Sequence, residues 1–368
     1  MESTNAMRRR RLGLRTVAAV SIMSMLLAAC SSSTSTSPAA STPAPAASQS
    51  LAATSSPAAS IATKPLLVAI NNQATSQYFI DVQSAFVKEV GVLGGVAKTF
   101  DSKTDANLTI SLMNDAVSAG AKGIAVSAPG TLGPAMDKIA KDAGIVLVAT
   151  DVSQQDQAGK PIPFVGFDGK AMGTAVGNEA ATLIGNAGWL KDSSKKVGVL
   201  SVEAQAYPVC QDRTNASKAL MIAAGVPAAN VYQVPYGGDT SSAQNASGPV
   251  ITAHPDVTNW VIFSCNDEGV LGALNALASG GAKPANIIGV GLGAYAACKP
   301  WFANQPSGFK AALFISGLDV GKAAADVLWD TVVNGKPLPA QTVAKTTMVD
   351  PTTYQTIMDP ASLAACKA

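Results

Sequence analysis

The feature that most constrains the fold is a regular alternation of short apolar runs with helical patterns. The apolar runs are rich in β-branched residues and fall at 66–70, 123–126, 145–149, 163–167, 197–201, 231–234, 260–263, 287–290 and 311–314. Helical patterns occupy the intervals between them, for example 79–92, 106–119, 173–188, 216–224 and 268–279. Nearly continuous apolar strands separated by helices predict an α/β fold with parallel sheets that are buried on both faces.

The predicted strands are more numerous than one compact domain of this kind usually holds. A natural break after Phe167 divides them into two doubly wound parallel-sheet lobes. Open parallel sheets bind ligands beyond the carboxyl ends of their strands, so two facing lobes predict one shared cleft. The loops that follow the strands are therefore the place to look for a binding site.

The N-terminal residues have the pattern of an export signal. A basic cluster at 8–11, with Arg15, precedes an uncharged run at 16–29 that is too short to span a bilayer comfortably. The run closes on small residues before Cys30, which resembles the bacterial lipobox, where the cysteine is lipidated and becomes the mature N-terminus. We therefore predict a signal peptide at 1–29 and a lipid anchor on Cys30. The alternative is an ordinary cleavage site beside a chance cysteine.

Residues 30–64 are the predicted tether between this anchor and the folded part of the chain. After Cys30 the segment is almost wholly Ser, Thr, Ala and Pro, a composition that buries too little apolar surface to offset the entropy of ordering.

The formal net charge of the chain is only +2 and no basic stripe is present. This balance argues against nucleic acid as a partner.

Several kinds of catalytic site lack the residues that they need. The only histidine is His254, so neither a histidine-based metal cluster nor a histidine general base can be assembled. The string Gly289-Val290-Gly291 lacks the further glycine and the helix of a dinucleotide site. We therefore predict a protein that is not an enzyme and that needs no cofactor and no metal.

Stretches of the second half resemble the corresponding segments of bacterial arabinose-binding proteins. They are 231–235, 254–257 with 260–262, and 265–267 with 270–272 and 287–291. The similarity runs from about Leu66 to Tyr354 and keeps the same order through both lobes. On this resemblance the chain is identified as a member of the type I periplasmic sugar-binding proteins of ABC transporters, in a lipoprotein form.

The resemblance implies a two-lobe fold with three interdomain crossings and hinged closure around the ligand. The crossings would fall near 167–168, 314–317 and 348–350. The N-terminal lobe would then comprise 65–167 with 315–347, and the C-terminal lobe 168–314 with 348–368.

The same resemblance assigns binding residues to the strand-end loops. Asp151 matches the family carboxylate that grips vicinal hydroxyls, Arg213 the arginine that donates to ring or hydroxyl oxygens, and Asn266 the asparagine of its loop. Tyr78 and Phe79 match the aromatic pair after the first strand. A sugar needs such a set because it presents hydroxyls around flattened apolar faces. The alternatives are helix caps or turns for the polar residues and core packing for the aromatic pair.

Four positions depart from the arabinose pattern. Asn72 and Ser76 stand where that family has a lysine and a glutamate, and Gly293 stands where it has an asparagine. Val152 replaces the second of two adjacent aspartates. The hydroxyls that these groups would hold must be absent, bridged by water, or bound elsewhere. A tetritol, a pentitol or a different pentose therefore fits the altered set at least as well as arabinose.

Two further side chains, Asn71 and Gln73, are candidates to hold the hydroxyls that lose a partner. The predicted ligand-binding set itself is Asn72, Ser76, Tyr78, Phe79, Asp151, Phe167, Arg213, Cys265, Asn266 and Gly293.

Four cysteines follow Cys30 in an exported chain, which permits disulfides. Cys210 and Cys265 lie in neighbouring strand-end loops of one lobe, so we expect them to pair. Cys298 would pair with Cys366 because the C-terminal segment should pack back on that lobe. The alternative is four free buried thiols, which behave as small apolar groups.

These observations favour a binding component of an ABC importer for a monosaccharide or small polyol. We expect it to lie outside the cytoplasm, anchored to the outer face of the cell membrane, to act as a monomer, and to deliver its ligand to the transporter permease. An enzyme on the same fold would need an acid-base pair or a cofactor loop that the sequence lacks. A ligand-sensing receptor component on the same fold remains the alternative, because a fold does not determine its partner.

Overall fold

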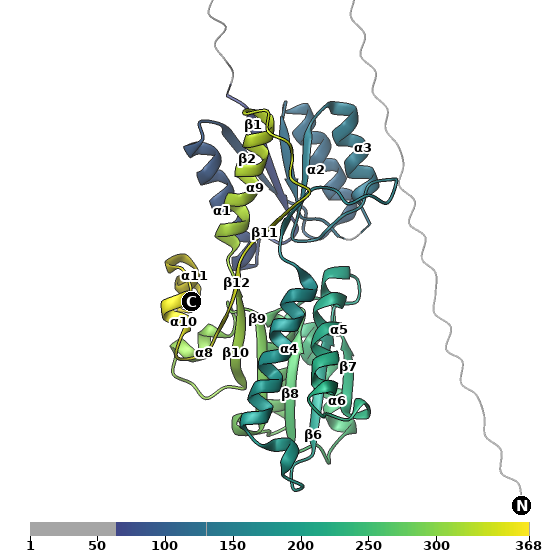
Figure 1. The fold of residues 1–368 in the computed structure, drawn as a ribbon, viewed down its shortest axis with the longest axis vertical. Coiled ribbons are helices and arrows are strands. Elements are labelled where there is room, and N and C mark those ends of the chain that lie inside the picture. Colours follow the sequence, from purple (N-terminus) through teal and green to yellow (C-terminus); the bar gives the residue numbers. More distant parts are fainter. Residues whose placement is uncertain (1–63, 130, 368) are drawn as a thin grey trace, which may run out of the picture. The chain divides into compact units, whose positions relative to one another are not determined.

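The computed structural model describes residues 64–129 and 131–367 (Figure 1). The predicted signal peptide at 1–29, the lipidation site Cys30 and all of the predicted tether except Lys64 lie outside the described residues. The described residues build two sheets of six strands each, which confirms the prediction of two α/β lobes. 

The first sheet is parallel throughout and has the strand order β11-β5-β4-β3-β1-β2. Its strands are β1 (Leu66–Asn71), β2 (Val96–Asp101), β3 (Gly123–Val126), β4 (Val146–Thr150), β5 (Phe164–Gly166) and β11 (Gln341–Val343). The helices of this lobe are α1 (Gln77–Val92), α2 (Ala106–Ser118), α3 (Gly133–Ala143) and α9 (Gly317–Val332). 

Both faces of the first sheet are covered by helices. Successive residues of a strand point to opposite faces, and β1 divides its side chains accordingly. Leu67 packs in one cluster with Phe86 of α1 and Leu328 of α9, whereas Val68 packs in another with Met113 of α2. Helix α9 lies beside α1 although far from it in the sequence (Figure 1). Burial on both faces explains why the strands read as continuous apolar runs.

The second sheet has the order β12-β10-β9-β8-β6-β7 and is parallel except for β12, which is antiparallel to β10. Its strands are β6 (Val197–Glu203), β7 (Val231–Pro235), β8 (Asn259–Ser264), β9 (Ile287–Gly293), β10 (Phe309–Ile315) and β12 (Thr346–Val349). Its helices are α4 (Gly169–Asn186), α5 (Pro208–Ala223), α6 (Thr240–Ala253), α7 (Asp267–Ser279), α8 (Cys298–Phe302), α10 (Tyr354–Ile357) and α11 (Pro360–Ala365). The prediction of a parallel sheet is therefore wrong only for β12 at the edge, and an antiparallel edge strand on a parallel sheet is common.

The described chain passes between the two sheets three times. The first two passages, from β5 to α4 and from β10 to α9, lie where the sequence places them. The third lies between β11 and β12, and is earlier than expected. Strand β12 pairs with β10 from Thr346 onward, so 346–347 belong to the second sheet and not to the N-terminal lobe. Ile315, the last residue of β10, likewise belongs to the second sheet.

Close packing of α4 against α5 sets the position of Arg213. Ser217 donates from Oγ to the carbonyl oxygen of Gly173, at 2.9 Å, and to that of Arg213, at 3.1 Å. A Cβ atom at Gly173 would overlap the carbonyl oxygen of Arg213. The backbone of Arg213 can therefore lie this close to α4 only because Gly173 has no side chain.

Replacing Gly173 by alanine tests this packing. Because α5 must move away from the added methyl group, we expect the free energy of unfolding to fall by about 1–3 kcal/mol. Gly185, at the exposed end of the same helix, is the matched control, since a Cβ there meets nothing within 4 Å. Gly185→Ala should leave stability unchanged or raise it by up to about 1 kcal/mol. Chemical denaturation measures both, and equal effects would contradict the close approach.

Candidate functional site

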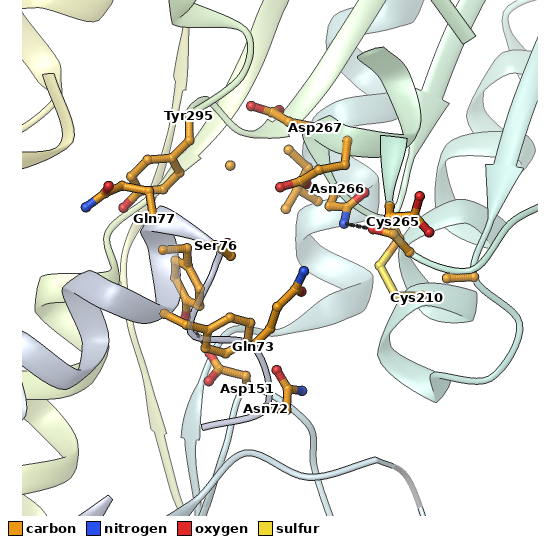
Figure 2. Close-up of a pocket in the computed structure, with 18 of the residues that line it drawn as sticks. Asn72, Gln73, Ser76, Gln77, Asp151, Cys210, Cys265, Asn266, Asp267 and Tyr295 are labelled. Carbon is orange, nitrogen blue, oxygen red and sulfur yellow. Dashed lines mark hydrogen bonds between the residues drawn. A yellow bond between two sulfur atoms is a disulfide. The ribbon is translucent and has the colours of Figure 1, made fainter. Parts of the chain in front are cut away.

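A cavity of about 840 Å³ lies at the carboxyl ends of strands from both sheets (Figure 2). The first lobe contributes the loop after β1 and the residues that follow β4 and β5, and the second contributes the loops after β6, β7, β8 and β9. All ten residues of the predicted ligand-binding set line this cavity: Asn72, Ser76, Tyr78, Phe79, Asp151, Phe167, Arg213, Cys265, Asn266 and Gly293.

Asp151 follows β4 in a left-handed backbone conformation, with φ of +62°. Such a conformation is uncommon for a residue with a side chain and is a feature of functional sites. Its Oδ1 atom accepts a hydrogen bond from the Tyr78 hydroxyl. Its buried Oδ2 atom has no hydrogen-bond partner among the described residues. The structure thus presents one carboxylate oxygen that is held in place and a second that remains available.

Burial raises the pKa of the Asp151 carboxyl to about 6. The hydrogen bond from Tyr78 and the charge of Arg213 oppose this effect and favour the ionised form. Burial and the Asp151 charge raise the pKa of the Tyr78 hydroxyl, so Tyr78 stays neutral and remains a donor. The carboxyl is therefore mostly ionised at neutral pH, although its pKa of about 6 lies only slightly below that pH.

Arg213 extends from α5 towards the same cavity. Its Nη1 atom donates to the Cys265 carbonyl oxygen at 2.9 Å. Its Nε atom is buried, and no atom of the described part of the chain accepts from it. Burial lowers the pKa of the guanidinium, whereas the negative charge of Asp151 raises it. Because a guanidinium has five N–H donors and no acceptor, most of its capacity is left for a ligand.

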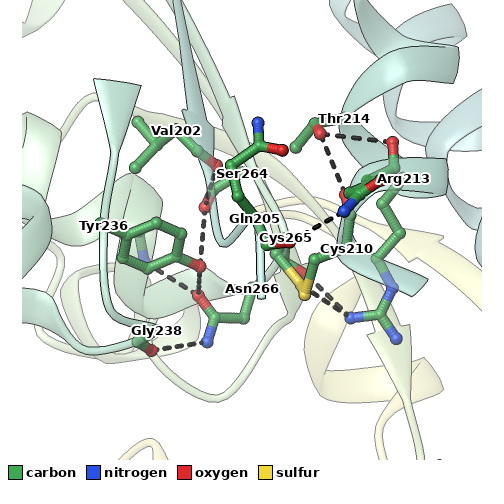
Figure 3. Close-up of a disulfide and its surroundings, with 12 residues drawn as sticks. Val202, Gln205, Cys210, Arg213, Thr214, Tyr236, Gly238, Ser264, Cys265 and Asn266 are labelled. Atoms are coloured by element: carbon green, nitrogen blue, oxygen red, sulfur yellow. Dashed lines mark hydrogen bonds between the residues drawn. A yellow bond between two sulfur atoms is a disulfide. The ribbon is translucent and has the colours of Figure 1, made fainter. Parts of the chain in front are cut away.

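Asn266 has a structural role as the N-cap of α7. Its Oδ1 atom accepts from the backbone N–H of Gly269 at 3.0 Å and from the Tyr236 hydroxyl at 2.6 Å. Its Nδ2 atom donates to the Gly238 carbonyl at 3.0 Å (Figure 3). Asn266 therefore does cap a helix, which was the alternative interpretation of its place in the sequence. Only one amide N–H of Asn266 is left for the cavity.

Aromatic rings gather around Tyr78. Its ring centroid lies 5.1 Å from that of Phe79, 6.4 Å from that of Phe167 and 6.4 Å from that of Tyr295. The cluster combines both lobes, since Tyr295 follows β9 of the second sheet. These rings supply an apolar surface beside the charged pair of Asp151 and Arg213.

Tyr295 also links the lobes through hydrogen bonds. Its hydroxyl donates to Asp81 Oδ2 of α1 at 3.2 Å, and it accepts from the backbone N–H of Gly317 at 3.4 Å. Ser362 Oγ of α11 donates to the same hydroxyl at 3.3 Å. Burial raises the pKa of the Asp81 carboxyl, and hydrogen bonds from Gln77 and Tyr295 partly offset this effect. Tyr295 therefore bridges the two lobes next to the second crossing.

Sequence reasoning missed several residues that line the cavity. Tyr236 directly follows β7 and Tyr295 lies two residues after β9, much as Asp151 directly follows β4. Their positions at strand ends are the sequence feature that could have identified them. Glu268 in the first turn of α7 also lines the cavity. Burial and the neighbouring Asp267 carboxylate raise the pKa of Glu268 to about 7. 

Asn71 and Gln73, the two amides expected to hold hydroxyls that lose a partner, differ in their position relative to the cavity. Gln73 lines the cavity, whereas Asn71 is absent from its lining. Asn71 ends β1 as a buried residue, and its Nδ2 atom donates to the Phe79 carbonyl at 3.4 Å. Asn71 is therefore a support of the loop. At Gly293, φ is +127°, a conformation that only glycine adopts readily, so no side chain reaches the cavity from that position.

The structure joins the four cysteines of the described chain in the two pairs that the sequence predicts. Cys210 at the start of α5 is bonded to Cys265 after β8, with their Cα atoms 4.8 Å apart. Cys298 in α8 is bonded to Cys366 after α11, with their Cα atoms 5.2 Å apart. Only the first bridge belongs to the cavity lining (Figure 2).

Residues 64–129 and 131–367 contain no group of three or more His, Cys, Asp or Glu side chains suited to a metal ion. None of the helices described is both long and apolar enough to cross a membrane.

Residues 67–337 match the profile of the family described as periplasmic binding protein domain. The chain belongs to this family. It is 30% identical over 244 residues to an ABC transporter L-arabinose-binding periplasmic protein of Azospirillum brasilense, covering 65% of this chain and 72% of the relative. It is 29% identical over 233 residues to the L-arabinose-binding periplasmic protein of Escherichia coli K12, covering 62% and 70%. It is thus a type I periplasmic binding protein near the arabinose-binding group.

Two solved structures agree with this fold. An ABC transporter solute-binding protein of Bacillus halodurans with bound myo-inositol superposes with a TM-score of 0.67 at 16% identity, covering 80% of this chain and 97% of that chain. A solute-binding protein of Mycobacterium smegmatis with bound glycerol gives a TM-score of 0.64 at 21% identity, covering 80% and 97%. The relatives and structures compared are binding proteins, in keeping with a chain that is not an enzyme.

The raised pKa of Asp151 predicts a pH-dependent stability. A carboxyl group whose pKa rises from 3.8 to about 6 on folding stabilises the folded state below pH 3.8, and that contribution is lost as the pH rises through 6. Relative to Asp151→Asn, the ligand-free wild type should therefore lose up to about 3 kcal/mol of unfolding free energy between about pH 4 and about pH 7. 

Denaturant titrations of both proteins across this pH range make the comparison. Tyr78→Phe is the matched variant, since removing a hydrogen bond that lowers the pKa of Asp151 should move the loss of stability to higher pH. Parallel pH profiles for wild type and Asp151→Asn would contradict the raised pKa.

Proposed function

We propose that the protein is the substrate-binding component of an ABC importer and captures a monosaccharide or small polyol in the interlobe cavity. The observation that carries this proposal is the pairing of an available carboxylate oxygen on Asp151 with available guanidinium donors on Arg213 in one cavity. A hydroxyl group both donates and accepts, so it satisfies the two residues together. The aromatic cluster around Tyr78 supplies the surface for the apolar face of a ring.

The ligand is proposed to be neutral and rich in hydroxyls. The charged partners of the arabinose pattern are replaced by Asn72, Ser76 and Val152, and Gly293 offers only backbone. A tetritol, a pentitol or a pentose other than arabinose suits this set. The two solved structures of the same fold with bound myo-inositol and glycerol support the inclusion of polyols.

Binding is proposed to shift a hinge equilibrium. Only contacts made to both lobes at once favour a closed state over an open one. Asp151 and Tyr78 belong to the first lobe and Arg213 to the second, so one ligand that reaches all three meets this condition. Rotation about three crossings is the kind of hinge that permits such closure.

The cellular setting is proposed from the N-terminal sequence and from the family. Export at 1–29 and lipidation at Cys30 would hold the protein outside the cytoplasm at the outer face of the cell membrane, on the tether at 30–64. The partner would be the permease of the importer, which recognises the protein as a monomer in its closed form.

A thermal-shift screen tests the ligand class. Pentoses, hexoses and polyols of four to six carbons are added separately, because a ligand that binds only the folded state raises the melting temperature by mass action. At a concentration of a hundred times Kd the stabilisation should reach about 2.7 kcal/mol. If no member of the panel raises the melting temperature, the carbohydrate assignment is wrong although the fold remains.

Substitution of the charged pair tests the site. Asp151→Ala and Arg213→Ala should each weaken binding of the best panel member by about 1.5–3 kcal/mol, or roughly 10- to 150-fold, while the protein stays folded. Asp142→Ala is the control, since that side chain is 66% exposed and is not among the residues that line the cavity. Calorimetric titration measures the affinities, and an unchanged affinity removes the substituted residue from the site.

A further inference from the structure

We propose that the Cys210–Cys265 disulfide is a positioning element of the binding site, which holds the Arg213 guanidinium in place before a ligand arrives. Figure 3 shows the disulfide and the Arg213 side chain beside each other on the wall of the second lobe. The effect on ligand affinity rests on the proposed function, whereas the effect on Arg213 itself does not.

The disulfide and the Arg213 hydrogen bond connect the same two segments. Cys210 lies in the first turn of α5 and Arg213 one turn later on the same helix. Cys265 lies between the end of β8 and the Asn266 cap of α7. Arg213 Nη1 contacts both the carbonyl oxygen of Cys265, at 2.9 Å, and its Sγ atom, at 3.5 Å. The covalent bond therefore fixes the acceptor that orients the guanidinium.

The described residues give the guanidinium no second anchor. Its hydrogen bonds within the described residues all go to Cys265. Its Nε atom is buried and lacks a partner in the same part of the chain. If Cys265 shifts, the Arg213 head group therefore loses its orientation, although its backbone stays where Gly173 and Ser217 hold it.

Little other apolar packing holds the segment of Cys265. Cys210 and Cys265, 6% and 4% exposed, form a small cluster with Ala204 that is separate from the larger cores. Tyr207, Val209 and Tyr236 pack around this cluster, and all three also line the cavity. The disulfide thus lies at the cavity wall, where a deep core is absent, and supplies the constraint that packing supplies elsewhere.

The second disulfide is a matched control. Cys210 and Cys265 are 55 residues apart and Cys298 and Cys366 are 68 apart, so the two bridges close loops of similar length. Similar loops make similar contributions to the entropy of the unfolded chain. Cys298 contacts the Tyr295 carbonyl and not Arg213. Loss of either bridge should lower the melting temperature, but only loss of the first should release Arg213.

The composition of the chain makes this release directly observable. Arg213 is the only arginine after Arg15. In the full chain labelled with ¹⁵N only at arginine, the Nε–H resonance of Arg213 is identified by its loss in Arg213→Lys. We expect this resonance to be dispersed in the wild type and in C298A/C366A, and to move to the position of an unrestrained arginine in C210A/C265A.

An unchanged Arg213 resonance in C210A/C265A would overturn the proposal. If that double variant does not fold, the same resonance is followed while a phosphine reductant opens the disulfides of the folded wild type and of C298A/C366A. Collapse of the resonance during reduction of C298A/C366A, which retains only the Cys210–Cys265 bridge, supports the proposal, and persistence after complete reduction overturns it.

The effect of the disulfide on ligand affinity is measured with D-ribose, xylitol, erythritol and myo-inositol as probes. For any probe that binds the wild type, C210A/C265A should weaken binding by about 3- to 10-fold, because a rotamer-rich side chain must then be ordered on binding. In an Arg213→Ala background the same double substitution should have no further effect. An equal loss in both backgrounds would mean that the disulfide acts other than through Arg213. If none of the four probes binds the wild type, the proposed function loses support while the resonance still tests the positioning role.

Discussion

Helices cover both faces of each sheet, and this constraint decides where the protein can carry out polar chemistry. A side chain along a central strand is surrounded by apolar groups whichever way it points, as Leu67 and Val68 are on the two faces of β1. A charged group on such a strand would lose its hydration without compensation. Polar side chains therefore reach the cavity from beyond the last residue of a strand, where Asp151 follows β4 and Asn266 lies just after β8. 

The charged residues of the site are incompletely satisfied. Burial raises the pKa of Asp151 and lowers that of Arg213, so it acts against the charge on both. Each residue also leaves one buried polar atom without a partner within the described chain. In a core that serves only stability, such atoms are a cost. A ligand that supplies hydroxyls would satisfy both, so the cost in the free protein becomes a source of affinity.

The two walls of the cavity are held by different means. On the first lobe, the loop after β1 brings Tyr78 to Asp151, and a single hydroxyl orients the carboxylate. On the second lobe, a disulfide and the capping amide of Asn266 lie in adjacent residues and bind α5, β7 and α7 together. Tyr295 joins the lobes through Asp81 and Gly317, beside a crossing where rotation would occur. The proposed binding site and the proposed hinge therefore share neighbouring residues.

The alternation of apolar runs and helical patterns by itself determined the two lobes, the central strands and the loops that line the cavity, because periodicity and burial on both faces are local properties of a sequence. Of the four edge strands, the pattern predicted β7 and missed β2, β11 and β12. Strand β2 is half exposed, and β12 depends on pairing with the distant β10. Only the tertiary structure decided that Asn266 caps α7, that Asn71 supports a loop, and that Tyr295 meets Asp81 across 214 residues. Such contacts depend on where separate strands end in space, which no local pattern records.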